Sequence, residues 1–208
     1  MTTPTFAPDG RPRCPWSGAA PEFLAYHDTE WGFPGAGDDR RLFEKLSLEG
    51  FQSGLSWRTI LAKRDNFRAA FNGFDVHSVA RFTERDVERL LQDAGIVRHR
   101  GKIEAVVNNA RRVEDLLDRE DSLAALVWRY EPAPEDLPEP QTVSTSPASV
   151  ALSKDLRKQG WKFVGPTTVF AFMQAMGLLN DHAEECAIRP EAEQARAAFT
   201  RSGRRGSS

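Results

Sequence analysis

Both cysteines of this 208-residue chain lie near its ends, and each has a histidine close by. Cys14 and His27 come early in the sequence, whereas His182 and Cys186 follow about 155 residues later. Two thiolates and two imidazoles suit a tetrahedral Zn²⁺ ion, and a site with four protein ligands is structural because no position remains for water. Such an ion would close a very long loop and hold the two ends of the chain together. The alternative is two buried free cysteines and two ordinary histidines, since Cys-x12-His is a loose spacing.

The composition is typical of a globular protein. Hydrophobic residues make up 40% of the chain and charged residues 28%, and 208 residues are enough to bury a core. No apolar run approaches the ~20 residues that a membrane span needs. Met1–Arg13 is rich in Pro and Thr and lacks the apolar centre of a secretory signal. Because there is no signal and there are only two cysteines, we expect a cytoplasmic protein and no membrane partner.

The charge of the chain leaves nucleic-acid binding open. A formal net charge of −2 argues weakly against it, because nucleic-acid-binding domains are often basic. Two segments are nevertheless locally cationic, Arg98–Lys102 and Lys154–Lys162. Each could equally be a solvated helix face, which is the more common use of such residues.

Apolar residues recur at helical spacing in nearly every segment, and none shows sustained alternation, so we expect an all-α fold. Capping residues mark several helix starts, such as a capping box at Thr83 and the pair Ser146-Pro147. His182 and Cys186 are four residues apart, which would place both on one side of a helix if their segment is helical. The predicted helices begin near Asp38, Thr83, Ile103, Ser146 and Pro166, and Gly95, Gly160 and Gly177 follow the ends of three of them.

The chain reads as one domain between two poorly ordered ends. We expect residues 1–12 and 191–208 to be disordered. Residues 13–190 are expected to form a single all-α domain with two helical lobes. Within it, Pro132–Pro140 is rich in proline and acidic residues, which is typical of a linker or of a loop on the surface.

The segment Gly160–Thr168 predicts a helix end, a tight hairpin and the start of a second helix. The unpaired N–H groups at the start of the second helix, together with a glycine-permitted turn, make an anion site the size of a phosphate. Such a helix–hairpin–helix would hold a DNA backbone without reading its sequence. The alternative is an ordinary corner between two helices. The candidate DNA contacts are Lys158, Lys162, Gly165 and Thr167.

Aromatic residues are concentrated in the first third of the chain, where Glu49 lies in an apolar stretch that contains glycine. A carboxylate there is costly to bury unless it is paired or used. A carboxylate among aromatic faces describes a pocket for a flat, polar ring, including a cationic one. The alternatives are that the aromatic residues only fill a core and that Glu49 is a solvated helix residue. The aromatic residues are Trp16, Phe23, Tyr26, Trp31, Phe33, Phe43, Phe51 and Trp57.

Five segments, in order and in register, closely resemble those of the DNA-3-methyladenine glycosylase I family. The resemblance runs from Cys14 to Cys186, which is nearly the whole predicted domain. The segments are Cys14–Trp16, Tyr26–Gly32, Leu48–Trp57, Asp93–Ile103, and Phe163–Gly165 continuing to Asn180–His182.

The resemblance implies an all-α member of the helix–hairpin–helix glycosylase superfamily. It implies a structural zinc ion bound by Cys14, His27, His182 and Cys186, which joins the N- and C-terminal segments. It also implies a base pocket at Tyr26, Trp31, Glu49 and Trp57, with Trp16 and Phe23 as further candidates for substrate binding. At the position of Phe23 the family carries a tyrosine, so this chain lacks one hydroxyl on the pocket wall.

The activity implied is hydrolysis of the N-glycosidic bond of 3-methyladenine in double-stranded DNA, by a monomeric enzyme. Methylation at N3 makes the base cationic and a good leaving group, so the enzyme must mainly extrude and hold it. We assign the main role to Glu49 and keep Asp181 as a minor candidate, because it adjoins His182. No lysine is needed as a Schiff-base nucleophile, so we expect a monofunctional enzyme. The rival interpretations are a DNA-binding module without chemistry and a glycosylase for another alkylated base, such as 7-methylguanine.

Overall fold

Regular structure in this protein is almost entirely helical, as the apolar spacing predicts. The computed structural model describes residues 4–35 and 38–201. Its α-helices are α1 (Pro21–Thr29), α2 (Asp39–Gln52), α3 (Trp57–Ala62), α4 (Arg64–Ala70), α5 (Val76–Ala80), α6 (Glu84–Gln92), α7 (Arg100–Leu117), α8 (Leu123–Trp128), α9 (Pro147–Lys158), α10 (Pro166–Ala175) and α11 (Arg189–Ala198). Three short 3₁₀ helices are η1 (Pro15–Gly18), η2 (Asn72–Phe74) and η3 (Pro134–Asp136).

The predicted helix caps are confirmed. The Asp38 carboxylate accepts a hydrogen bond from the backbone N–H of Arg40 at the start of α2. Thr83 forms the expected capping box at α6, and Ser146 caps α9 with Pro147 in its first turn. These caps satisfy N–H groups that have no partner within their own helix, so the local sequence fixes where the helices begin.

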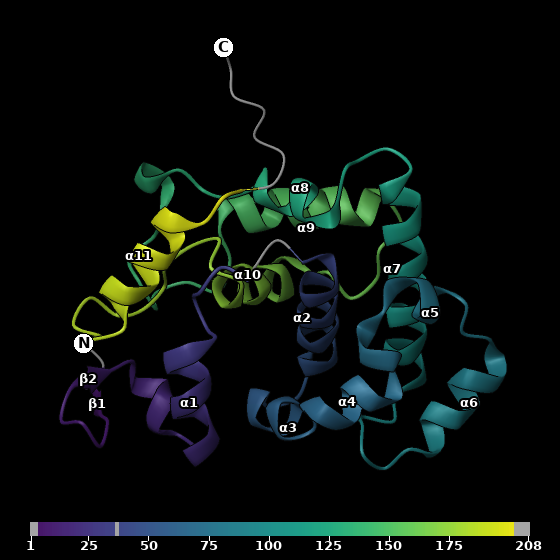
Figure 1. The fold of residues 1–208 in the computed structure, drawn as a ribbon, viewed down its shortest axis with the longest axis horizontal. Helices are drawn as coiled ribbons and strands as arrows, with labels where there is room; N and C mark the ends of the chain where they lie inside the picture. The colour runs from purple at the N-terminus through teal and green to yellow at the C-terminus, as the bar shows by residue number, and fades with distance from the viewer. Residues whose placement is uncertain (1–3, 36–37, 202–208) are drawn as a thin grey trace.

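Helix α2 lies near the centre of the molecule, with α10 on one side of it and α7 on the other (Figure 1). Every residue from Leu42 to Phe51 is buried, including the charged side chains Glu44, Lys45 and Glu49. A helix buried on all sides needs partners for its charges, because an unpaired buried charge is very costly. The central helix therefore carries both the core and the polar groups of the candidate site.

The expectation of a disordered N-terminus is wrong for the residues from Pro4 onward, while residues 1–3 lie outside the described part of the chain. Strand β1 (Thr5–Phe6) pairs antiparallel with strand β2 (Pro12–Arg13). The guanidinium of Arg13 is buried and lies 2.8 Å from Asp9 and 3.0 Å from Asp28. These ion pairs fix the short hairpin against α1.

The expected disorder from residue 191 is also wrong, because α11 continues to Ala198. Its Arg196 is buried and donates to the backbone carbonyls of Gly177 and Leu178, at 2.8 and 3.1 Å. Arg196 also lies 3.2 Å from the carboxylate of Glu131. Residues 202–208 of the predicted tail lie outside the described residues.

The N-terminal hairpin of β1 and β2 lies near the start of α11, on the same side of the molecule as α1, whereas the chain after α11 runs toward α8 (Figure 1). The proline-rich segment between α8 and α9 is a surface loop that contains η3. Among the residues that the structure describes, no helix is both long and apolar enough to cross a membrane.

Candidate functional site

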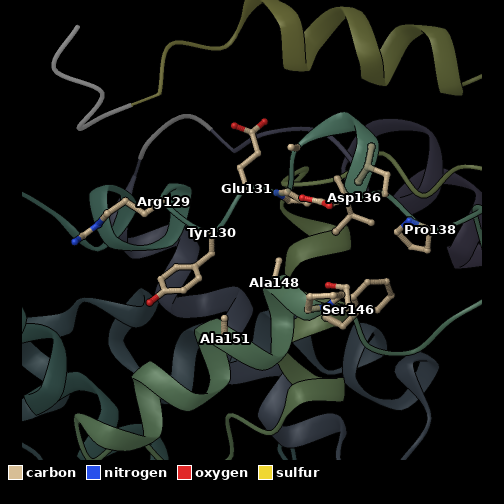
Figure 2. Close-up of a pocket in the computed structure, with 14 residues that line it drawn as sticks. Arg129, Tyr130, Glu131, Asp136, Pro138, Ser146, Ala148 and Ala151 are labelled. Carbon is tan, nitrogen blue, oxygen red and sulfur yellow. The ribbon is translucent and has the colours of Figure 1, made fainter. Parts of the chain in front are cut away.

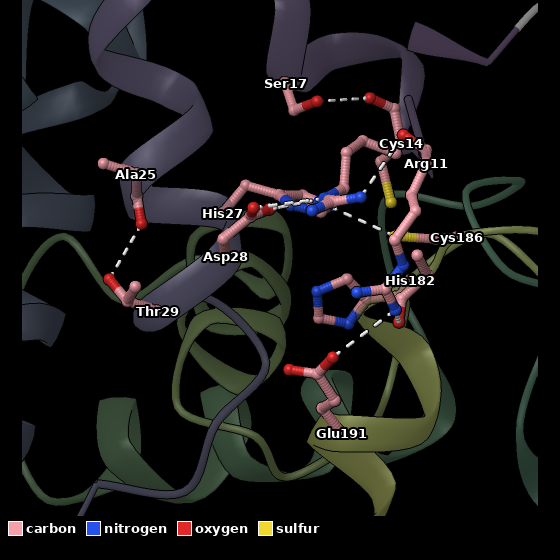
Figure 3. Close-up of polar contacts among 12 residues, drawn as sticks. Arg11, Cys14, Ser17, Ala25, His27, Asp28, Thr29, His182, Cys186 and Glu191 are labelled. Atoms are coloured by element: carbon pink, nitrogen blue, oxygen red, sulfur yellow. Dashed lines mark hydrogen bonds and ion pairs between the residues drawn. The ribbon is translucent and has the colours of Figure 1, made fainter. Parts of the chain in front are cut away.

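Cys14, His27 and Cys186 come together where the two ends of the chain meet. Cys14 precedes η1, His27 lies in α1, and Cys186 lies between α10 and α11. One ligand atom from each residue can be chosen so that all three lie within 4.8 Å of one another, and all three residues are buried. Figure 3 shows these side chains facing one another, with the two sulfur atoms beside the His27 ring. This group could hold a metal ion.

His182, the fourth predicted ligand, borders this group but is not one of its three close members. His182 and Cys186 do not share a helix, because residues 181–188 form turns and bends. The His182 ring is fully buried and its centroid lies 4.9 Å from that of His27. Its Nδ1 lies 2.9 Å from the Asn180 side-chain oxygen, whereas its buried Nε2 has no hydrogen-bond partner. A ring that donates Nδ1–H to Asn180 leaves the Nε2 lone pair free for a metal.

The protonation states of two of these groups suit a cation. Burial, together with the nearby His27, lowers the pKa of His182 to about 4, so the ring is neutral at pH 7. Hydrogen bonds from Cys14 and His27 lower the pKa of Cys186, which favours its thiolate. The same contact with Cys186, together with burial, raises the pKa of Cys14, so this residue would lose its proton only when a cation binds. Neutral imidazole and thiolate are the forms that bind metal ions.

The groups around the cluster hold it in place. Asp28 accepts from the Arg13 guanidinium, and its Oδ1 lies 2.7 Å from Nδ1 of His27. That contact fixes the ring so that Nε2 faces Cys186, with 3.6 Å between Nε2 and Sγ. Gly32 has φ +84°, and a Cβ there would lie 2.6 Å from Cε1 of His182. The close approach therefore requires glycine at this position.

A cavity of about 310 Å³ lies beside the cluster, and all six residues predicted for base binding line it. This volume falls within the range of small-ligand sites, which combine apolar walls with a few polar groups. Three further polar residues line the cavity that were not predicted from the sequence: Gln52, Gln141 and Gln174. The predicted lining residues are Trp16, Phe23, Tyr26, Trp31, Glu49 and Trp57.

Trp31 forms a wall shared by the cavity and the cysteine–histidine cluster. Its ring centroid lies 4.7 Å from that of His182 and 5.0 Å from that of Trp16, both edge to face. The His27 ring stacks on Trp31 at 6.0 Å. The residues that could hold a metal therefore also position an aromatic face of the cavity.

Glu49 is buried and lines the cavity from α2. Its Oε1 lies 2.9 Å from Nζ of Lys45, one helical turn earlier. Its Oε2 is buried and has no hydrogen-bond partner in the protein. A buried carboxylate oxygen without a donor is costly, so it points to a donor supplied by a bound molecule.

Lys45 is the charged residue that the sequence analysis missed. Its Nζ donates a 2.6 Å hydrogen bond to the Tyr26 hydroxyl oxygen and lies 3.6 Å from the centroid of the Trp57 ring. Burial, together with the nearby carboxylate of Glu49, raises the pKa of Tyr26 well above its ordinary value, so the phenol keeps its proton. The spacing of Lys45 and Glu49, four residues apart on a helix, is the signal that could have revealed the pair.

Asp181 does not line the cavity but holds two residues that do. Its carboxylate accepts from the backbone N–H of Gln141 at 3.1 Å and from Nε2 of Gln174 at 2.6 Å. Burial raises the pKa of Asp181, although the hydrogen bond from Gln141 opposes this. The structure therefore favours a supporting role for Asp181 over the catalytic one kept as a minor candidate.

The predicted hairpin connects α9 to α10. Lys158, Lys162 and Thr167 are exposed, and Gly165 is the N-cap residue of α10. The side chain of Asn109 in α7 holds the turn by bonding both the N–H and the carbonyl of Lys162, at 2.8 and 2.9 Å. The turn is thus fixed by the core while its basic side chains face outward.

A second depression, of about 330 Å³, lies between the start of α10 and the aromatic cavity. It shares Glu49, Gln52 and Ala171 with the cavity and includes Thr167. The start of α10 and the aromatic cavity therefore lie along one continuous hollow.

Another cavity, of about 480 Å³, lies beneath the proline-rich loop and is lined by none of the predicted site residues (Figure 2). Several of its polar side chains have protein partners. The Tyr130 hydroxyl donates to Asp155 at 2.8 Å, and Glu131 lies 3.2 Å from Arg196. In Figure 2 the Glu131 carboxylate points away from Ala148. The aromatic cavity, which holds an unpartnered carboxylate oxygen, is therefore the better candidate for a site.

Comparisons with known proteins agree on one group. A family model described as methyladenine glycosylase matches residues 16–189. The DNA-3-methyladenine glycosylase 1 of Escherichia coli (strain K12) is 48% identical over 182 residues, which are 86% of this chain and 97% of that protein. A crystal structure of 3-methyladenine DNA glycosylase I has a TM-score of 0.78 and 47% identity, and the match covers 84% of this chain and 98% of that one. A structure of 3-methyladenine DNA glycosylase I from Staphylococcus aureus, which concerns recognition of 3-methyladenine, has a TM-score of 0.77 and 38% identity. The match covers 82% of this chain and 93% of that one.

Proposed function

Because this chain belongs to the methyladenine glycosylase family, we propose that it hydrolyses the N-glycosidic bond of 3-methyladenine in DNA. The reaction releases the free base and leaves an abasic site, which is the first step of base excision repair. The observation that carries the proposal is the aromatic cavity with one unpartnered carboxylate oxygen, Oε2 of Glu49. A flipped, methylated adenine complements this cavity. Its flat ring can stack on the aromatic walls, its positive charge is attracted to Glu49, and its exocyclic amino group can donate to Oε2.

The residues that line the cavity would bind the base in different ways. Trp57 and Trp31 offer faces for stacking on the base, and Trp16 and Phe23 complete the apolar wall. Glu49 would accept from the amino group of the base, and its negative charge favours the cationic form. Because the methylated base is a good leaving group, the enzyme needs to hold the base and to stabilise the positive charge that develops on the sugar, rather than to protonate the base. Phe23 adds a ring face and no polar contact.

We propose a hydrolytic, monofunctional mechanism. No lysine is among the residues lining the aromatic cavity in the described part of the chain. Lys45 is buried beneath Tyr26 and Trp57, where it could not reach a sugar carbon as a Schiff-base nucleophile. Water is therefore the acceptor of the sugar.

We propose that Zn²⁺ binds to Cys14, His27, His182 and Cys186. The close group of three residues and the buried, unpartnered Nε2 of His182 support this ligand set. When bound, the ion would supply a structural cross-link between the chain ends, because four protein ligands leave no position for a reacting water.

We propose that α9, the hairpin and α10 hold the DNA backbone as a helix–hairpin–helix. Lys158 and Lys162 are exposed, and their positive charges suit a phosphate. The backbone N–H groups of Gly165 and Thr167, at the start of α10, could donate to the same phosphate. The depression that contains both Thr167 and Glu49 supports this proposal, because it connects the site expected for the DNA backbone with the site expected for the flipped base. Double-stranded DNA, a monomer and a cytoplasmic location remain our predictions for the partner, the assembly and the compartment.

The test is chromatography of the bases released from methylated duplex DNA. The proposed function requires free 3-methyladenine in the supernatant and alkali-labile abasic sites in the duplex. Release of 7-methylguanine alone would favour the rival substrate. Binding without any release would favour a DNA-binding module without chemistry.

A further inference from the structure

Lys45 connects Glu49 and Tyr26, two polar residues of the aromatic cavity, without lining the cavity itself. It is 3% exposed, and its ammonium contacts Oε1 of Glu49 at 2.9 Å and the Tyr26 hydroxyl at 2.6 Å. The face of Trp57 covers the ammonium from a third side, at 3.6 Å from the ring centroid. A lysine in this position acts through Glu49 and Tyr26, because it does not reach the ligand itself.

These contacts give each partner one defined hydrogen-bonding role toward the cavity. Since Oε1 of Glu49 is engaged by Lys45, Oε2 is the oxygen left to accept. Since the Tyr26 oxygen accepts from Lys45, its own hydrogen is left to donate. The cavity therefore presents an acceptor from α2 and a donor from α1.

We propose that Lys45 is a positioning residue that sets this acceptor–donor pair and thereby makes the cavity selective for adenine over guanine bases. The inference deepens the proposed function and rests on it. Adenine presents an N6 amino donor beside the N7 acceptor, which complements Glu49 and Tyr26. Guanine presents two acceptors, O6 and N7, along the same edge, so its O6 would face the Glu49 carboxylate. An acceptor facing a buried carboxylate is repelled, which disfavours methylated guanine.

The charge of Lys45 is set by groups from several helices. Glu49 and Arg41 lie on the same helix, Arg64 lies on α4, and the Tyr26 phenol comes from α1. Glu30, at the end of α1, pairs with both Arg41 and Arg64 at 2.7 Å. Burial lowers the pKa of Lys45 to about 8, although Glu49 opposes this. The ammonium is therefore present at neutral pH and is lost as the pH rises through about 8.

Two variants separate charge from packing. Lys45→Met keeps a long, unbranched side chain but removes the charge and all three donors. Lys45→Arg keeps a positive charge at every accessible pH. Each variant is compared with the wild-type enzyme in single-turnover excision on methylated duplex DNA, from pH 6 to about 10. Thermal unfolding and zinc content are measured in parallel to show that the variants are folded.

The proposal predicts three results. Lys45→Met excises 3-methyladenine roughly ten-fold or more slowly at pH 7, as expected for the loss of an ion-paired hydrogen bond. Its ratio of 3-methyladenine to 3-methylguanine release falls, because Glu49 and Tyr26 are no longer held in defined roles toward a base whose O6 and N7 are both free. The wild-type rate declines above pH 8, whereas Lys45→Arg, which cannot lose its charge, shows no such decline.

The outcomes that overturn the proposal are distinct from those that overturn the proposed function. A wild-type enzyme that releases no 3-methyladenine contradicts the function itself. A wild-type enzyme that releases it, with Lys45→Met unchanged in rate, base ratio and pH profile, contradicts only the role of Lys45. If Lys45→Met does not fold, the comparison of wild type with Lys45→Arg decides, and an identical decline in both would overturn the proposal.

Discussion

The indole ring of Trp31 lies 4.7 Å from the ring of His182 and also forms a wall of the aromatic cavity. The same ring stacks on His27. The cluster of Cys14, His27 and Cys186 and the aromatic cavity are therefore connected through one aromatic residue. A disturbance of the cluster should reach the cavity through Trp31, although the cluster itself does not line it.

We predict that Cys186→Ala loses bound zinc and lowers the melting temperature, while the folded fraction still excises the base. The loss follows because one of the proposed ligands that tie the chain ends is removed. Metal analysis and thermal unfolding measure the two effects, and excision is assayed well below the new melting temperature. Thr29→Ala, on the exposed side of α1, is the control and should keep its metal. Full stability with no turnover would instead indicate a catalytic metal.

We predict that Glu49→Ala slows excision of 3-methyladenine by roughly ten- to two-hundred-fold, since a hydrogen bond to a charged partner is worth ~1.5–3 kcal/mol. Glu49→Gln should fall between wild type and Glu49→Ala, because it keeps the shape and one acceptor but loses the charge. Single-turnover excision gives the rates, and Glu114→Ala, on the exposed face of α7, is the control.

Glu49→Ala also leaves the Lys45 ammonium buried without its carboxylate. That loss can destabilise the fold by itself. The double variant Glu49→Ala/Lys45→Met removes both charges and should recover stability without recovering excision. A wild-type rate in either variant would show that the base binds elsewhere.

We predict that Lys162→Ala and Lys158→Ala each weaken binding to an abasic duplex and reduce its salt dependence by about one counterion. The identity of the excised base should not change, because backbone contacts carry no sequence information. Affinities measured over a series of salt concentrations give the slope. Arg85→Ala, an exposed cation on α6 away from the hairpin, should keep the wild-type slope. Unchanged slopes in both lysine variants would exclude this hairpin as the DNA contact.

We predict that Gly32→Ala destabilises the protein by more than the ~1–2 kcal/mol expected for a left-handed residue alone. Its φ is +84°, and the new Cβ would lie 2.6 Å from Cε1 of His182. Gly10→Ala is a matched control, since φ is +75° there and nothing lies within 4 Å of the new atom. Chemical unfolding gives both energies, and metal analysis shows whether His182 has moved. Equal losses in the two variants would mean that the ring adapts without cost.

The sequence predicted the helical core well because caps and apolar spacing are local signals. It failed at both ends, where order depends on distant partners. The hairpin before α1 is held by Arg13 and Asp28, and α11 is held by Arg196 against the carbonyl of Gly177. Whether His182 and Cys186 share a helix was left open by the sequence. In the structure the Asn180 side chain accepts from the backbone N–H of His182, which favours a turn.

Much of the cavity followed from the aromatic residues, Glu49 and the family resemblance. Gln141 and Gln174 could not be found this way, because only the folded chain brings both to Asp181. Lys45 was overlooked because a lysine on a helix is usually solvated. Its burial follows from the central position of α2, which no local pattern shows.

The cluster of Cys14, His27 and Cys186 also has a consequence for biosynthesis. His27 and Cys186 are 159 residues apart, so the early ligands leave the ribosome long before the late ones. At ~5–20 residues per second, the interval is roughly 8–30 s. During this time the Cys14 thiol lacks its partner Cys186. The cluster is therefore complete only after Cys186 has emerged, and the proposed binding of a metal ion there requires a cellular environment that keeps the Cys14 thiol reduced until then.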